Sequence, residues 1–261
     1  MRKKFWTILL TAFVFLSGSA LGISTVYRVE TVTVNVQYVT DGARTEGERL
    51  QACLEDAYQG NSTFFAKRKT AEDVLAENPY FRLTGFEKSY PKRLVIDLVE
   101  KAEIYAVEKT AGVEYYLLSA DGVVLDIRNT YPHPSSGEEP VLLKGLTATA
   151  EIGKVPTGDG YLTELLSVCN EFSTQLNGIR SNVVSVELLR KEPETVLSVT
   201  MREGVRIYMI NPGAQTAEKV ACALTKYFAL SDAEKMSGRI LLIENSGEIY
   251  ADYSKVDDFT S

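Results

Sequence analysis

Within the run VETVTVNV at residues 29–36, polar and hydrophobic residues alternate from Thr31 to Val36. Val32, Val34 and Val36 share one side of an extended chain, and threonine or asparagine occupies the other side. A period of two is typical of a strand that buries one face. We therefore predict a first strand at these residues.

Two helices are predicted to follow, each behind a capping-box motif. Thr45 and Glu48 form the first motif, and Thr70 and Asp73 form the second. A capping box predicts a helix start, and Pro79 cannot continue a helix, so it ends the second one. The apolar residues that recur at helical spacing are Leu50, Cys53, Leu54, Ala57 and Tyr58 in the first helix and Ala71, Val74 and Leu75 in the second.

Two further strands are predicted at about 83–89 and 94–100. Tyr90 and Pro91 lie between them, and the fixed backbone angle of Pro91 favours a tight turn. The predicted order is therefore strand, helix, helix, strand, strand. This order buries one face of a small sheet under two helices.

The remainder of the chain is predicted to be rich in strands. In the run VEYYLLSADGVVLDI, the pair Asp121 and Gly122 stands between two strand-like segments, which is the strongest local indication of a hairpin. Helices are predicted at 162–176 and around Val220, Leu224 and Phe228. Further strands are predicted at about 183–189, 196–202, 205–210, 239–244 and 248–253.

An uncharged apolar run extends from Phe5 to Ile23. As a helix it is about 28 Å long, close to the thickness of the hydrocarbon core of a bilayer. Arg2, Lys3 and Lys4 precede it, so residues 1–4 are expected in the cytoplasm and the rest of the chain outside. We predict a transmembrane helix at residues 5–25. A cleaved signal peptide remains the alternative, because small residues follow the densest apolar part.

Composition and charge narrow the choice of partners. The chain is 45% apolar and 24% charged, which is typical of a globular protein with one or two cores. Its net charge is −7, and an acidic balance disfavours nucleic acid as a partner.

Three cysteines are widely spaced along the chain. Cys53, Cys169 and Cys222 each lie in a helix-like apolar pattern, where a small hydrophobic residue is the default interpretation. A bridge between Cys169 and Cys222 is the alternative for a chain outside the cytoplasm.

The residues give little indication of catalysis. His133 is the single histidine, and it lies in a proline-rich loop. No cysteine and histidine cluster has zinc spacing, and no glycine-rich phosphate loop occurs. The carboxylate pairs Glu138 with Glu139 and Asp257 with Asp258 lie in polar loop or tail. We therefore predict no enzyme activity, no metal, no cofactor and no small-molecule substrate.

Several motifs of the first half resemble a POTRA domain, and more narrowly that of the FtsQ/DivIB family of bacterial cell-division proteins. They are LAENPYF at residues 75–81, the pair Tyr90 and Pro91, LVIDLVEK at residues 94–101, and Ala106. The resemblance assigns a structural signature to Pro79, Tyr90, Pro91 and Glu100. The Gly-Asn pair that usually follows the first strand in this family is missing.

The second half also resembles that family in the order of its motifs. After the Asp-Gly turn come VVLD, a loop, and PVLLKG at residues 140–145. The resemblance implies an α+β fold with a transmembrane helix, a POTRA domain at 27–106, a β domain at 107–253 and a tail at 254–261. The β domain is expected to hold a mixed or antiparallel sheet flanked by helices.

The last predicted strand is the candidate binding segment. It contains Ile249, Tyr250, Ala251, Asp252 and Tyr253, and an unpaired sheet edge can accept a strand from a partner. Two exposed tyrosines are expected to anchor that partner. The alternative is a closing strand of the core with half-buried tyrosines. In the family resembled, this region binds coiled-coil division proteins of the FtsB/DivIC kind.

The resemblance therefore implies a single-pass membrane protein of the division septum with its body outside the cytoplasm. Its role is that of a non-enzymatic divisome scaffold that binds FtsB/DivIC-like and FtsL-like partners and helps control septal peptidoglycan synthesis. Two alternatives stay open: a POTRA protein of envelope transport or assembly, and an exported cell-wall hydrolase.

Overall fold

The fold is described from a computed structural model. It covers residues 26–40, 43–110, 113–132, 139–158, 160–245, 247–257 and 259. The chain divides into two compact units. Unit 1 contains the described residues up to Ala102, and unit 2 begins at Glu103. The predicted boundary after residue 106 falls inside a strand of unit 2.

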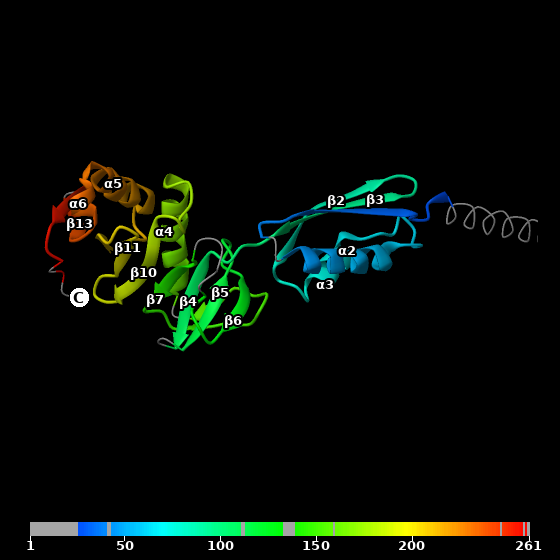
Figure 1. Cartoon of the computed structure of the whole chain (residues 1–261), viewed down its shortest axis with the longest axis horizontal. Coiled ribbons are helices and arrows are strands. Elements are labelled where there is room, and N and C mark those ends of the chain that lie inside the picture. The colour runs from blue at the N-terminus through cyan, green and yellow to red at the C-terminus, as the bar shows by residue number, and fades with distance from the viewer. Residues whose placement is uncertain are drawn as a thin grey trace, which may run out of the picture. The chain divides into compact units, whose positions relative to one another are not determined.

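Unit 1 is a three-stranded sheet covered on one face by two helices (Figure 1). The strand order is β1-β3-β2, with β1 parallel to β3 and β2 antiparallel to β3. The hydrophobic alternation on β3 buries Leu94, Ile96 and Leu98 toward the helices. The elements are β1 (Thr31–Gln37), α2 (Arg44–Tyr58), α3 (Arg68–Leu75), β2 (Phe81–Ser89) and β3 (Arg93–Glu100).

Neither helix of unit 1 begins at the capping box that the sequence predicts. Helix α2 follows Ala43 and helix α3 follows Lys67, and neither residue makes a side-chain cap bond. Thr45 and Thr70 lie inside the helices. Burial of an amphipathic face outweighs the local capping signal here, because packing supplies most of the stability of a short helix.

Unit 2 contains a nine-stranded sheet in the order β14-β13-β12-β11-β10-β7-β4-β5-β6. Its strands are β4 (Tyr105–Thr110), β5 (Glu114–Leu118), β6 (Val124–Arg128), β7 (Val141–Lys144), β10 (Val183–Arg190), β11 (Val196–Met201), β12 (Arg206–Ile210), β13 (Arg239–Asn245) and β14 (Glu248–Ser254). Two short strands, β8 (Ala148–Thr149) and β9 (Thr157–Gly158), form a separate pair.

Helical segments connect two pairs of parallel neighbours within this sheet. Helix α4 (Tyr161–Gln175) lies in the chain between β7 and β10, and α5 (Thr216–Ala229) with α6 (Asp232–Lys235) lies between β12 and β13. Both strand pairs are parallel, and a parallel pair needs such a crossover. Helices α4 and α5 contact each other and pack on the same core.

The fold class predicted from the sequence is wrong. The described residues form a mixed α/β structure that includes a large sheet in unit 2, whereas the prediction was α+β with a membrane helix. The periodicity of a strand shows which face is buried, but it does not show the direction of its neighbour. In the described part of the chain, no helix is long and apolar enough to cross a membrane. The predicted segment, residues 5–25, lies outside that part.

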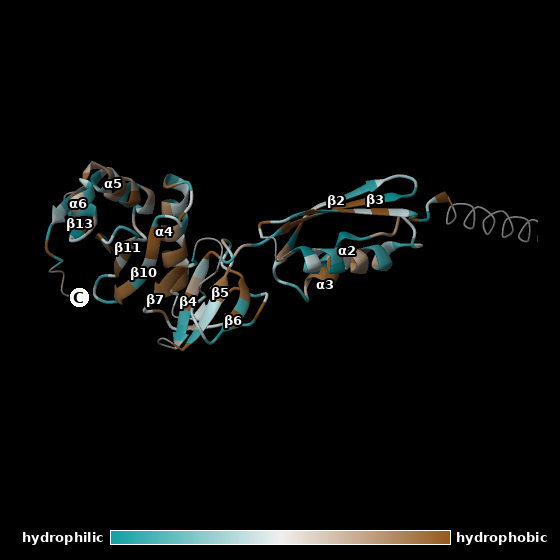
Figure 2. Ribbon diagram, in the orientation of Figure 1, coloured by the Kyte–Doolittle hydropathy of each residue, from teal (hydrophilic) through white to brown (hydrophobic). Residues whose placement is uncertain are grey.

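The core of unit 2 lies between the sheet and these two helices. Figure 2 shows hydrophobic residues concentrated along β7 and β10. The large buried side chains include Phe172 on α4 and Tyr227 on α5. The predicted hairpin is present as β5 and β6, with Gly122 in the left-handed backbone region at φ +75°.

Candidate interaction edge

Strand β14 is a margin of the nine-stranded sheet. It pairs with β13 in antiparallel register over its whole length, from Asn245 with Glu248 to Arg239 with Ser254. Among the described residues, β14 makes no backbone hydrogen bond to a second strand or to a loop. The Ile249 carbonyl accepts a hydrogen bond from the Cys222 thiol of α5 at 3.6 Å. The other outward-facing backbone groups of β14 are available to a partner strand.

The side chains of β14 alternate between the core and the solvent. Ile249, Ala251 and Tyr253 pack against the core cluster beneath α5. Glu248, Tyr250 and Asp252 are exposed on the opposite face. The five predicted binding residues thus lie on one strand, but they fall into two groups with different surroundings.

Tyr250 is the exposed aromatic residue of this margin. Half of its surface is open to solvent (50%), and its hydroxyl donates a hydrogen bond to the Glu248 carboxylate. That bond raises the pKa of the tyrosine. Ile243 lies directly opposite on β13 and is also exposed. The pair forms a small apolar surface beside the open strand.

Tyr253 differs from the expected exposed anchor. Its ring is partly buried against the core, and its hydroxyl donates to the carbonyl oxygens of Glu234 at 3.2 Å and Ser237 at 3.3 Å. These carbonyls belong to α6 and the turn that follows it. Tyr253 therefore holds α6 against the end of β14.

We expect Tyr253→Phe to lower the free energy of unfolding of unit 2 by about 1 kcal/mol, the net contribution of one hydrogen bond. Chemical denaturation of the full chain measures the change. Tyr250→Phe is the matched control, because it also removes one hydroxyl but from an exposed ring, and its expected effect is below about 0.5 kcal/mol. Equal effects of the two substitutions would contradict the bracing role of Tyr253.

The chain beyond β14 turns toward the exposed face of the sheet. Asp257 accepts hydrogen bonds from Arg206 at 3.0 Å and from the Tyr208 hydroxyl at 2.9 Å. Phe259 stacks on the Tyr208 ring with centroids 4.3 Å apart. Both contacts are to β12, which is two strands inside the margin. These residues therefore cover β12 and do not form backbone bonds with β14.

A cavity of about 540 Å³ lies where β12 and β13 separate. Its lining includes Ile210, Ile243 and Ile249. Lys219 of α5 is buried in its wall and donates to the carbonyl oxygens of Ile210 at 3.0 Å and Asn211 at 2.8 Å. The ammonium group thus satisfies carbonyls at the end of β12, which an apolar side chain would leave unpaired.

The opposite margin of the sheet is partly covered by the chain itself. The backbone N–H of Val124 on β6 donates to the Lys154 carbonyl at 2.9 Å, and the N–H of Gly153 donates to the Val124 carbonyl at 2.8 Å. A strand added at β6 would have to displace these bonds. This difference favours β14 as the receptive margin of unit 2.

The predicted signature residues lie in unit 1. Pro79 lies between α3 and β2, beyond the end of the helix at Leu75. Tyr90 and Pro91 form the turn between β2 and β3, and their peptide bond is cis. None of them lies in the same unit as β14.

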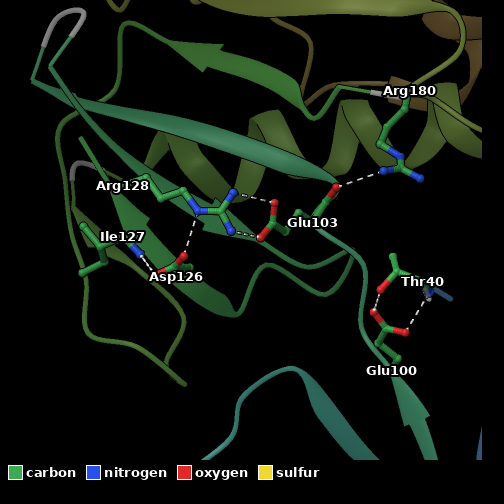
Figure 3. A network of polar contacts seen from close by, with 7 residues as sticks. All are labelled: Thr40, Glu100, Glu103, Asp126, Ile127, Arg128 and Arg180. Atoms are coloured by element: carbon green, nitrogen blue, oxygen red, sulfur yellow. Dashed lines mark hydrogen bonds and ion pairs between the residues drawn. The ribbon is translucent and has the colours of Figure 1, made fainter. Parts of the chain in front are cut away.

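Glu100, the last residue of β3, is buried and holds the loop that follows β1 (Figure 3). Its carboxylate accepts hydrogen bonds from the backbone N–H groups of Val39 at 2.6 Å and Thr40 at 2.9 Å. The Thr40 hydroxyl donates a third bond at 2.6 Å. Glu100 therefore fixes the loop after β1, in which the Gly-Asn pair of the resembled family is missing.

A second polar network at the start of unit 2 was not predicted. Arg128 on β6 donates to the carboxylates of Glu103 at 2.7 Å and Asp126 at 2.8 Å, as Figure 3 shows. Arg180 donates to the Glu103 carbonyl at 3.3 Å. The sequence did not predict the contact of Arg128 with Glu103, because the two residues are 25 positions apart. Together they fix the first residues of unit 2 to its sheet.

The cysteines and carboxylates form no reactive cluster in the described part of the chain. Cys53, Cys169 and Cys222 are free thiols, so the alternative disulfide is absent. Burial raises the pKa of Cys169 above its usual value. No group of three or more histidine, cysteine, aspartate or glutamate side chains there could hold a metal ion. His133 lies outside the described residues.

Comparison with known proteins adds no assignment. No protein-family model matches the chain. No curated protein matches it significantly.

Proposed function

We propose that this chain is a non-enzymatic scaffold of the bacterial division machinery, of the FtsQ/DivIB kind, which binds a coiled-coil partner through β14. The open backbone of β14 is the observation that carries the proposal. A partner of the FtsB/DivIC kind would add an extended segment to this margin, and an FtsL-like chain would join through the same subcomplex.

The side chains of the margin support strand addition. Backbone hydrogen bonds supply affinity in this mode, and side-chain contacts supply specificity. Tyr250 and Ile243 offer an exposed apolar contact next to the free backbone row. Tyr253 and Ala251 keep the strand in place from the core side, so the margin is already formed before a partner arrives.

The proposal assigns no chemical step, no cofactor and no small-molecule substrate to the chain. Its body would act outside the cytoplasm at the division septum. By holding its partners together there, it would help control the synthesis of septal peptidoglycan.

Two measurements test this function. A fluorescent fusion of the full chain is expected to gather at midcell in dividing cells. A pull-down with the same fusion is expected to recover the coiled-coil partner. A uniform envelope signal together with no recovery of the partner would refute the proposal and favour an envelope transport protein or an exported hydrolase.

A further inference from the structure

An exposed group of aromatic rings lies at one end of unit 1. Tyr27 precedes β1, Phe64 follows α2, and Tyr90 lies in the turn between β2 and β3. The ring centroids of Tyr27 and Phe64 are 4.5 Å apart, and those of Phe64 and Tyr90 are 5.3 Å apart. We call these three rings, together with Val26 and Phe65, which are their neighbours in the sequence, the aromatic platform.

The platform is exposed although its members are hydrophobic. Phe65 is 80% exposed, Tyr90 is 53% exposed and Phe64 is 49% exposed. Val26 is half exposed as well. Single exposed hydrophobic residues are ordinary, but a contiguous exposed group of this kind marks an interaction site.

Buried polar contacts hold the platform in shape. Thr63 is fully buried, and its hydroxyl donates to the carbonyl oxygens of Tyr27 at 3.0 Å and Pro91 at 2.7 Å. The Lys88 ammonium donates to the Phe64 carbonyl at 2.9 Å. One buried residue thus joins three segments that are distant in the sequence. The rings stay exposed on a rigid base, so their exposure is not a consequence of a loose loop.

The three segments that form the platform carry a net positive charge, whereas the whole chain is negative. Residues 26–30, 62–67 and 88–93 carry a single acidic residue, Glu30, and it is paired with Lys92. The chain has a net charge of −7, so this basic excess is local. The basic residues of these segments are Arg28, Lys67, Lys88, Lys92 and Arg93.

We propose that the aromatic platform docks unit 1 on the surface of an anionic bilayer. Tyrosine rings favour the headgroup region, and phenylalanine rings favour the acyl boundary beneath it. Each nearby lysine or arginine adds attraction to anionic lipid. The uncharged run from Phe5 to Ile23 ends just before Val26, which argues for lipid as the occupant over a protein partner. This inference concerns unit 1 alone and does not rest on the role of β14.

A single tryptophan reporter tests the docking in the full chain. Trp6 is the one native tryptophan, so Trp6→Phe removes it, and Phe65→Trp places a new one on the platform. The chain is reconstituted in vesicles of phosphatidylglycerol and phosphatidylcholine whose acyl chains carry bromine near the headgroup. We expect strong quenching of the reporter in these vesicles and weak quenching in pure phosphatidylcholine.

Two variants control the measurement. Phe228→Trp in the same background reports on an exposed ring of unit 2, and it is expected to remain unquenched. Lys67→Gln with Lys92→Gln removes two charges but no ring, and the equilibrium constant for docking is expected to fall about fivefold for each charge.

Three results would overturn the inference. One is a platform reporter as little quenched as the Phe228→Trp control. Another is quenching that is the same with and without anionic lipid. The third is a reporter that becomes shielded only when a protein partner is added, since this would assign the platform to protein recognition.

Discussion

Tyr250→Glu is expected to weaken binding of the coiled-coil partner about 30-fold or more. An aromatic anchor at an interface contributes at least about 2 kcal/mol, and about 1.4 kcal/mol corresponds to a factor of ten in affinity. The substitution removes the exposed ring of Tyr250 and places a third carboxylate between Glu248 and Asp252. Titration of the full chain with the partner measures the change in Kd.

The same substitution is expected to leave the fold intact. Tyr250 is half exposed and makes no contact with the core, and surface substitutions of this kind change stability by about 0.5 kcal/mol or less. Tyr90→Glu is the matched control, because Tyr90 has nearly the same exposure but lies in unit 1. In a lipid-free assay it should bind the partner normally. A Tyr250→Glu chain with a Kd within threefold of the original would exclude β14 as the binding margin.

Glu100→Ala is expected to destabilise unit 1 by about 2–4 kcal/mol. The carboxylate accepts three hydrogen bonds from Val39 and Thr40, and a bond to a charged group contributes about 1.5–3 kcal/mol. The expected loss is smaller than the summed free energy of the three hydrogen bonds, because Val39 is exposed and water can replace part of the bonding. Denaturant unfolding of the full chain measures the change.

Hydrogen exchange localises this effect. The amides of Val39 and Thr40 are expected to lose protection in Glu100→Ala before the amides of β1 do, since they lose their acceptor. Glu87→Ala is the control, because Glu87 is an exposed carboxylate on the neighbouring strand β2. If the two variants unfold at the same denaturant concentration, Glu100 does not hold the loop.

The positions of most strands and helices follow from local periodicity. The alternation around Val34, the stripe on α4 and the hairpin at Gly122 are all present in the structure. Each of these patterns reflects burial of one face, which is a property of neighbouring residues in the chain. The capping signals at Thr45 and Thr70 failed because packing decided where those helices start.

The candidate margin could be predicted only in part. The terminal run from Ile249 to Tyr253 alternates as a strand should, and the structure places it at the end of the sheet. The different roles of its two tyrosines could not be foreseen. Tyr253 is distinguished by its bonds to α6, a helix too short to leave a periodic signal in the sequence.

The sequence by itself determined where most of the strands lie, which of their faces are hydrophobic, and that the chain is acidic with an apolar run near its start. Tertiary structure alone decided that β7 with β10 and β12 with β13 run parallel, and that β14 ends the sheet. It alone also gathered Tyr27, Phe64 and Tyr90 into one platform. The reason is physical: periodicity records how a residue relates to its own strand or helix, whereas pairing and clustering depend on contacts between segments far apart in the chain.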